Sequence, residues 1–93
     1  MPRYLVERVF SEAAQQDIQE AGSRMKRVAV DSFPEITWEH SHVVSDESGI
    51  KSFCVYDSPN EETLHQHGDE VGVAGIVRIY EIAGDVTPAD FGD

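Results

Sequence analysis

Two strand-like stretches in the middle of the chain are separated by nothing more than a turn. Residues 36–44 and 50–57 are rich in β-branched and aromatic side chains, and residues 45–49 between them read SDESG, a cluster of turn-forming types. A connection of this length joins antiparallel neighbours, so the pattern predicts a β-hairpin. The rest of the chain must then be arranged around an antiparallel pair of strands.

Before the hairpin the sequence predicts one strand and one helix. Ser11 is a suitable N-cap, and apolar residues recur at spacings of three and four through residues 12–30, which predicts an amphipathic helix that ends before Pro34. Residues 3–10 (RYLVERVF) alternate in the manner of a strand, and one face of it is formed by Tyr4, Val6, Arg8 and Phe10.

After the hairpin the sequence predicts a second helix and a last strand. Ser58 as N-cap and Pro59 at the first helical position indicate a helix over residues 59–70, and residues 75–83 (GIVRIYEIA) have the composition of a strand. The order β-α-β-β-α-β is the ferredoxin-like, or split βαβ, arrangement. We therefore predict an α+β fold with a four-stranded antiparallel sheet, both helices on one face, and the other face open to a dimer partner or a ligand.

The length of the chain fits a single small domain. Its 93 residues can build one modest core, and chains of this size often bury further surface by pairing, so a homodimer is expected. We assign the domain to residues 2–83. Residues 84–93 are acidic and contain Pro and Gly, and we expect them to form a flexible tail.

The net charge and the cysteine content limit the kinds of partner and the cellular compartment that we expect for this protein. Acidic residues number 18 and basic residues 7, and the resulting formal charge of −11 repels nucleic acid and anionic membranes but favours a metal cation. Cys54 is the single cysteine, the amino terminus lacks the apolar core of a signal peptide, and no apolar run approaches ~18 residues. We expect a cytoplasmic protein without disulfides and without a membrane or nucleic-acid partner.

Two histidines in residues 36–44 (ITWEHSHVV) form the first candidate site. In a regular strand His40 and His42 lie on one face together with Trp38, and the Cα atoms of the two histidines are ~6.6 Å apart. Both imidazoles can then reach one metal ion, although a divalent cation needs further ligands from another strand, from the second helix or from a partner subunit. Alternatively, one histidine packs beside Trp38 and the other faces water.

The second predicted helix holds the other two histidines. Glu61, His65 and Asp69 are four residues apart and form a carboxylate–imidazole–carboxylate stripe that can bind a cation. His67 lies three residues after Leu64 and therefore close to the buried side of the helix. A solvated acidic helix with ordinary charge pairing explains the same pattern.

A small dimeric enzyme of isomerase or tautomerase type, with a pocket on the sheet, is an alternative interpretation. Its candidate acids and bases are Pro2, amino-terminal once Met1 is removed, and His40, Cys54 and Tyr56. A cysteine on a strand is, however, more typical of an apolar filler than of a nucleophile. A protein-interaction module that uses the open sheet face is a third interpretation.

Several segments of the chain together resemble one known family. They are VERVF in residues 6–10, ITWEHSHVV in 36–44, KSFCVYDSPNEE in 51–62 and IVRIYEI in 76–82. These segments are similar to those of small bacterial nickel-binding proteins that were first catalogued as a domain of unknown function. The resemblance extends over residues 2–83.

The resemblance implies a ferredoxin-like fold, a dimer formed through the sheets, and nickel bound at the protein surface without a known catalytic reaction. The matching positions that can bind metal are His40, His42, His65 and His67, with Glu7 and Glu39 as carboxylate candidates. Imidazole and carboxylate ligands also bind copper and zinc, so the choice of nickel rests on the resemblance. We expect a divalent metal-binding protein of nickel type that sequesters the ion or maintains its homeostasis.

Overall fold

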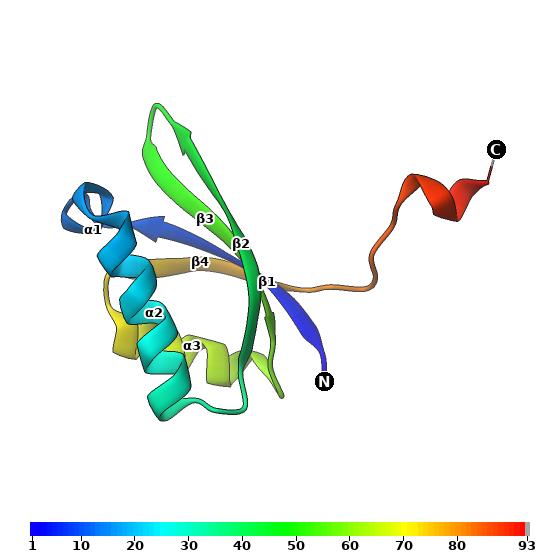
Figure 1. Ribbon diagram of the computed structural model, residues 1–93, viewed down its shortest axis with the longest axis horizontal. Helices are drawn as coiled ribbons and strands as arrows, with labels where there is room; N and C mark the ends of the chain where they lie inside the picture. Colours follow the sequence, from blue (N-terminus) through cyan, green and yellow to red (C-terminus); the bar gives the residue numbers. More distant parts are fainter. Residues whose placement is uncertain (93) are drawn as a thin grey trace.

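The chain forms one antiparallel sheet with its helices on a single face (Figure 1). A computed structural model describes residues 1–92. The elements, in chain order, are β1 (Arg3–Phe10), α1 (Glu12–Gln16), α2 (Ile18–Ser32), β2 (Thr37–Asp46), β3 (Gly49–Asp57), α3 (Glu61–Val71), β4 (Ala74–Glu81) and the short 3-10 helix η1 (Pro88–Phe91). The strands lie side by side in the order β2-β3-β1-β4, which is the predicted ferredoxin-like arrangement.

The predicted hairpin is present as β2 and β3. Its turn is fixed by Asp46, whose side chain accepts hydrogen bonds from the Ser48 amide at 2.8 Å and from the Ser48 hydroxyl at 2.6 Å. These hydrogen bonds lower the pKa of Asp46, because they stabilise its charged form. Gly49 follows with φ +119°, a backbone conformation that a residue with a Cβ rarely adopts, so glycine is required at the start of β3.

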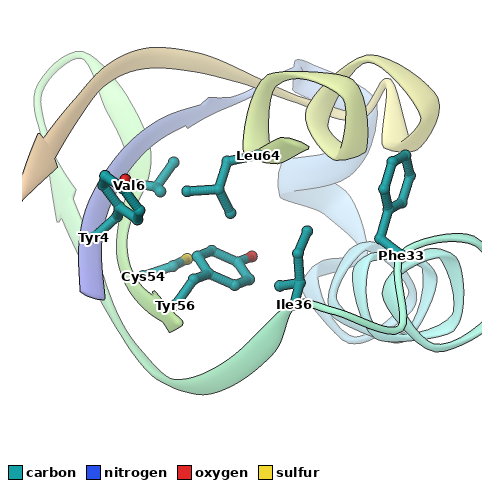
Figure 2. Close-up of a cluster of buried hydrophobic side chains, with 7 residues drawn as sticks. All are labelled: Tyr4, Val6, Phe33, Ile36, Cys54, Tyr56 and Leu64. Atoms are coloured by element: carbon teal, nitrogen blue, oxygen red, sulfur yellow. The ribbon is translucent and has the colours of Figure 1, made fainter. Parts of the chain in front are cut away.

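The core lies between the sheet and the helices (Figure 2). As the alternation predicts, Tyr4, Val6, Arg8 and Phe10 share one face of β1; this face points to the helices, and the four residues are at most 4% exposed. On β3 the neighbours Cys54 and Tyr56 are fully buried, and Leu64 of α3 packs against them. The side chains at the intervening positions of these strands face the opposite side, which no helix covers. We call this side the open face.

The first helix is not continuous over residues 12–30 as the sequence predicts. Asp17 interrupts it with φ −145° and ψ 76°, so that α1 ends at Gln16 and α2 begins at Ile18. The carboxylate of Asp17 accepts a hydrogen bond from the Glu20 amide at 3.0 Å and thereby caps α2. A side chain that competes for backbone donors in this way favours a cap over a helix interior, which explains the break.

The second helix begins two residues later than predicted. Asn60, and not Ser58, is the N-cap, because the Asn60 side chain accepts from the Thr63 amide at 2.8 Å. Ser58 is fully buried and donates its hydroxyl to the Asn60 carbonyl at 2.8 Å. The helix ends at Gly72, which has φ +72° and donates its N–H to the Gly68 carbonyl.

Residues after β4 lead away from the sheet as an extended arm (Figure 1). The arm starts near β1, where the Ile82 amide donates to the Arg3 carbonyl at 2.8 Å, and it carries the exposed Val86. Near its end the Thr87 amide donates to the Asp90 carboxylate and caps η1. Within residues 1–92 no helix is long and apolar enough to cross a membrane.

Candidate metal centre

A β-bulge in β2 determines which side chains reach the open face. Trp38 lies opposite Tyr56, but His40 lies opposite Val55, so Glu39 is an extra residue in β2. The bulge reverses the alternation: Trp38 faces the helices, whereas His40 and His42 face the open side. The prediction that Trp38 shares a face with the two histidines is therefore wrong.

Because of the bulge, neither His40 nor His42 packs beside Trp38, which was the alternative interpretation of this segment. The indole of Trp38 is stacked on Tyr56 with ring centroids 6.3 Å apart, and its Nε1 donates to the Ser41 hydroxyl at 2.8 Å. Ser41, the residue between the two histidines, therefore points to the helix side, where it lies opposite the buried Cys54. Its two neighbours, His40 and His42, are left exposed on the opposite face.

His40 and His42 form a pair of imidazoles on the outermost strand of the sheet. Their ring centroids are 5.3 Å apart and the ring planes are nearly perpendicular, at 86°. On the neighbouring strand β3, Val55 lies opposite His40 and Phe53 lies opposite His42. The side chains of Val55 and Phe53 have no atoms that can bind a metal ion. The pair can supply two nitrogen ligands to a cation approaching from the open face.

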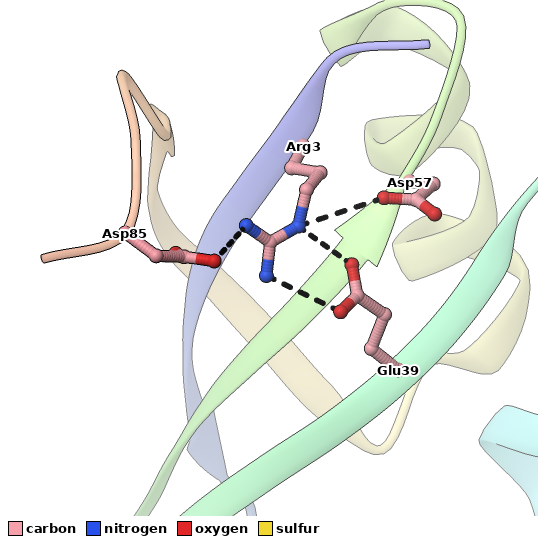
Figure 3. A network of polar contacts seen from close by, with 4 residues as sticks. All are labelled: Arg3, Glu39, Asp57 and Asp85. Carbon is pink, nitrogen blue, oxygen red and sulfur yellow. Dashed lines mark hydrogen bonds and ion pairs between the residues drawn. The ribbon is translucent and has the colours of Figure 1, made fainter. Parts of the chain in front are cut away.

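Glu39, a predicted carboxylate candidate, is engaged elsewhere (Figure 3). Its two carboxylate oxygens accept hydrogen bonds from Arg3 Nε at 2.8 Å and Nη2 at 3.2 Å. Arg3 also pairs with Asp85 of the arm at 2.7 Å and lies 3.9 Å from Asp57. The hydrogen bonds from Arg3 lower the pKa of Glu39. The pKa of Asp57 is raised, mainly by burial and to a smaller extent by the nearby Glu39 carboxylate.

The other predicted ligands do not lie near the histidine pair. Glu7 faces the open side from β1, but Phe53 of β3 lies between it and His42 in the register. His65 belongs to α3, which covers the opposite face of the sheet. In residues 1–92 no group of three or more His, Cys, Asp or Glu side chains is arranged to hold one metal ion.

His67 is buried in the core, as its place on the helix indicates. It is 0% exposed, Arg8 Nη2 lies 3.3 Å from its Nδ1, and the Met25 carbonyl lies 3.0 Å from its Nε2. A guanidinium only donates and a carbonyl only accepts, so the ring is neutral with its hydrogen on Nε2. Both nitrogens are then used within the protein, and we leave His67 out of the proposed metal site.

Burial makes His67 a source of acid sensitivity. Desolvation lowers its pKa below the usual 6.5, with Arg8 adding to the effect and with the Met25 carbonyl and Glu70 opposing it. Tyr56 and Phe33 close the remaining sides of the ring. The folded state therefore binds fewer protons at His67 than the unfolded state does. The stabilisation from neutral His67 is complete above the pKa that the histidine has in the unfolded chain, and it is lost as the pH falls through the lower pKa that it has in the folded protein.

We expect the free energy of unfolding to decrease by up to about 1.4 kcal/mol per pH unit below pH ~6.5 because of His67. Urea unfolding of the wild type and of His67→Gln between pH 7.5 and pH 5 measures this. Glutamine can donate to Met25 and accept from Arg8 but does not titrate in this range. Equal pH slopes for the two proteins would contradict the assignment.

Arg8 is a buried charged residue whose role the sequence did not predict, although the alternation of β1 places it on the face of Tyr4, Val6 and Phe10. It is 0% exposed, its Nη1 donates to the Ala74 carbonyl at 3.1 Å, and no ion pair with a carboxylate is present among residues 1–92. Its Nε and the hydroxyl of Tyr56 are both buried without a hydrogen-bond partner. Burial raises the pKa of Tyr56 to about 12, so that its phenol stays protonated.

The residues of the enzyme interpretation are not brought together. Cys54 and Tyr56 are fully buried on the helix side, whereas His40 is exposed on the open face. Cys54 lies 3.4 Å from the Ser52 hydroxyl, with no basic group among its hydrogen-bond partners. Pro2 lies just before β1, where its carbonyl accepts a hydrogen bond from the Ser58 amide.

The fold and the site define the class of this protein: a small ferredoxin-like α+β domain with a pair of histidines on an open sheet face. The profile of the family described as "Nickel responsive protein SCO4226-like" matches residues 4–82. The chain belongs to this family. The match extends from the second residue of β1 to Ile82, the first residue after β4, and leaves out the rest of the arm.

Two solved structures confirm the fold. The crystal structure of SCO4226 from Streptomyces coelicolor A3(2) matches with a TM-score of 0.66 and 14% identity over 90% of this chain and 99% of that chain. The C-terminal domain of the MgtC protein from Mycobacterium tuberculosis, solved in solution, matches with a TM-score of 0.61 and 12% identity over 90% of this chain and 88% of that one. A search of the curated proteins finds no match.

Proposed function

We propose that this protein binds a divalent cation, nickel in the first instance, through His40 and His42. The observation that carries the proposal is the exposed pair itself, with ring centroids 5.3 Å apart on one face of an edge strand. Nitrogen ligands of this kind suit nickel, copper and zinc, and the description of the family favours nickel among them. The role we infer is sequestration or homeostasis of the ion.

Two imidazoles leave most of the coordination positions of the ion to other ligands. Water can occupy them, and a second copy of the chain is the protein source that we propose. The open face carries apolar side chains that are at least partly exposed and that such a homodimer would bury, namely Leu5, Val9, Phe53 and Tyr80. Because β2 is an edge strand, each histidine pair would then lie at the rim of the interface, where ligands from both copies can meet.

The overall charge supports capture of a cation. A formal charge of −11 raises the local concentration of divalent ions around the whole surface, and the histidines provide the site at which desolvation and binding occur. Proton release follows, because an imidazole binds metal only in its neutral form. The single, fully buried thiol of Cys54 suits the cytoplasm, which remains the compartment that we expect.

Calorimetric titration of the tag-free protein with Ni²⁺ at pH 7.5 tests the proposal. We expect saturable binding to the wild type and an affinity at least about 100-fold weaker for His40→Ala/His42→Ala, since loss of both ligands should exceed the ~10–100-fold effect of losing a group that only supports a ligand. Both side chains are exposed, so the double variant should remain folded.

His65→Ala is the matched control, because His65 is also exposed but lies on the other side of the molecule. Its affinity should stay within about twofold of the wild type, as expected for an independent position. Absence of nickel, copper and zinc binding in the wild type would overturn the proposal. A loss of affinity in His65→Ala that equals that of the double variant would move the site to α3.

A further inference from the structure

A groove lies between α2 and β2 on the helix side of the sheet, away from the histidine pair. Its more enclosed part has a volume of about 400 Å³. It is lined by Lys26, Ala29 and Val30 of α2, by Pro34 and Ile36 of the segment that leads into β2, and by Trp38 of β2. A shallower continuation runs along α2 toward Ile18 and shares Lys26 and Trp38 with the first part, so the two form one groove.

The walls of the groove are apolar and belong to the ordered part of the fold. Ala29 and Ile36 are each only 7% exposed and form the inner wall, whereas Val30, at 66%, stands at the rim. Trp38 is held in place by its stack on Tyr56 and by the hydrogen bond to Ser41. A preformed apolar groove of this size fits the acyl or aromatic part of a small molecule.

The rim of the groove carries the positive charge of Lys26. Of the 7 basic residues in the chain, three fall within four positions of α2: Arg24, Lys26 and Arg27. Arg24 donates to the backbone carbonyls of α3, and Arg27 pairs with Glu20. Lys26 has no ion pair with any residue of the range 1–92, and it lines the groove. An anionic group at the end of a ligand would provide its missing partner.

The inner wall of the groove covers a buried polar atom, the hydroxyl of Tyr56. The hydroxyl of Tyr56 is 0% exposed as part of its residue and has no hydrogen-bond partner. Figure 2 shows this hydroxyl directed toward Ile36, which lines the groove. Tyr56 is not among the residues that line the groove, so Ile36 separates the hydroxyl from it, and the hydroxyl takes no part in the proposed site.

We propose that the groove between α2 and β2 binds a small amphipathic carboxylate. The carboxylate pairs with the ammonium group of Lys26, and the apolar part of the ligand lies along Ala29, Ile36 and Trp38. The site is separate from the histidine pair, which lies on the open face. Its occupation therefore does not depend on metal binding.

Fluorescence titration with sodium octanoate, in the presence of a metal chelator, tests this proposal. Trp38 is the single tryptophan of the chain, so any change in indole emission reports on the groove itself. We expect a saturable change with octanoate and, at the same ionic strength, weaker binding of the neutral octanamide by about two- to fivefold, the factor that corresponds to one exposed ion pair.

Three variants separate the groove from a non-specific effect. Lys26→Gln should weaken octanoate binding by the same factor of about two to five. Val30→Glu places a carboxylate four residues after Lys26, where it can pair with the ammonium group, and should weaken binding at least as much. Lys51→Gln, a lysine on β3 that pairs with Asp46, is the control and should bind as the wild type does.

The proposal would be overturned by the absence of a saturable change in the wild type. Equal binding of octanoate and octanamide would also overturn it, since the positive rim would then have no role. So would an equal loss in Lys26→Gln and Lys51→Gln, because a general charge effect, and not the groove, would explain the binding.

Discussion

Replacing Leu64 with alanine should lower the free energy of unfolding by about 3 kcal/mol, within the 2–5 kcal/mol known for fully buried leucines. Leu64 is 0% exposed, and it carries α3 onto the buried side chains of β1 and β3, among them Val6 and Tyr56 (Figure 2). Truncation removes apolar contact area and leaves a cavity between helix and sheet that well-packed neighbours fill only in part. Urea unfolding measures the loss as a lower midpoint at unchanged slope.

Val86→Ala is the matched control for this substitution. Val86 is 70% exposed on the arm, so its truncation should change the free energy of unfolding by less than about 0.5 kcal/mol. A loss below about 1 kcal/mol in Leu64→Ala would be too small for a fully buried leucine. The packing of α3 on the sheet would then be incorrect.

Replacing His67 with alanine should lower the free energy of unfolding by about 3 kcal/mol, from a cavity and from lost hydrogen bonds together. The change leaves a buried guanidinium nitrogen of Arg8 and the Met25 carbonyl without their partner. It also removes a ring that contacts Phe33 and Tyr56 edge-on, at centroid distances of 5.8 and 5.9 Å. Urea unfolding measures this loss at pH 7.5, where the imidazole is neutral in both the folded and the unfolded protein.

His67→Gln separates the polar part of this effect from the packing part. The amide can donate to Met25 and accept from Arg8, so the variant should recover at least about 1 kcal/mol, the typical worth of one satisfied buried hydrogen bond. If both variants were as stable as the wild type, the buried network of Arg8 and His67 would not contribute to the fold.

The order of helices and strands in this chain can be predicted from its sequence, because the local sequence signals agree with the tertiary packing. The turn sequence of residues 45–49, the alternation of β1 and the apolar stripe of α2 each point to the element that forms. The first residues of the helices are harder to predict. Asp17 and Asn60 act as caps through side-chain hydrogen bonds, and several other residues nearby have the same capacity.

The histidine pair was found from the sequence, but its surroundings were not. The bulge at Glu39 depends on how β2 aligns with β3, and strand periodicity alone assumes a regular ladder. Glu39 reaches Arg3, which is 36 positions away in the chain, so only the folded structure reveals that its carboxylate is occupied. The two histidines remain on one face because both follow the bulge.

The buried arginine is the feature that sequence reasoning missed most completely. Arg8 was correctly placed on the face of Tyr4 and Val6, which are apolar or amphipathic, and that placement was itself the available signal. A charged residue at a core position indicates a buried polar partner. The partner is His67, 59 positions away, and its identity depends on the docking of α3.

The most direct measurement of the central claim is NMR of the four histidine rings during addition of Ni²⁺ in substoichiometric amounts. Binding at the proposed site should shift or broaden the ring signals of His40 and His42 first, while those of His65 and of the buried His67 stay unchanged. Loss of the His65 signal before those of His40 and His42, or no change in any ring at one equivalent of Ni²⁺, would contradict the account.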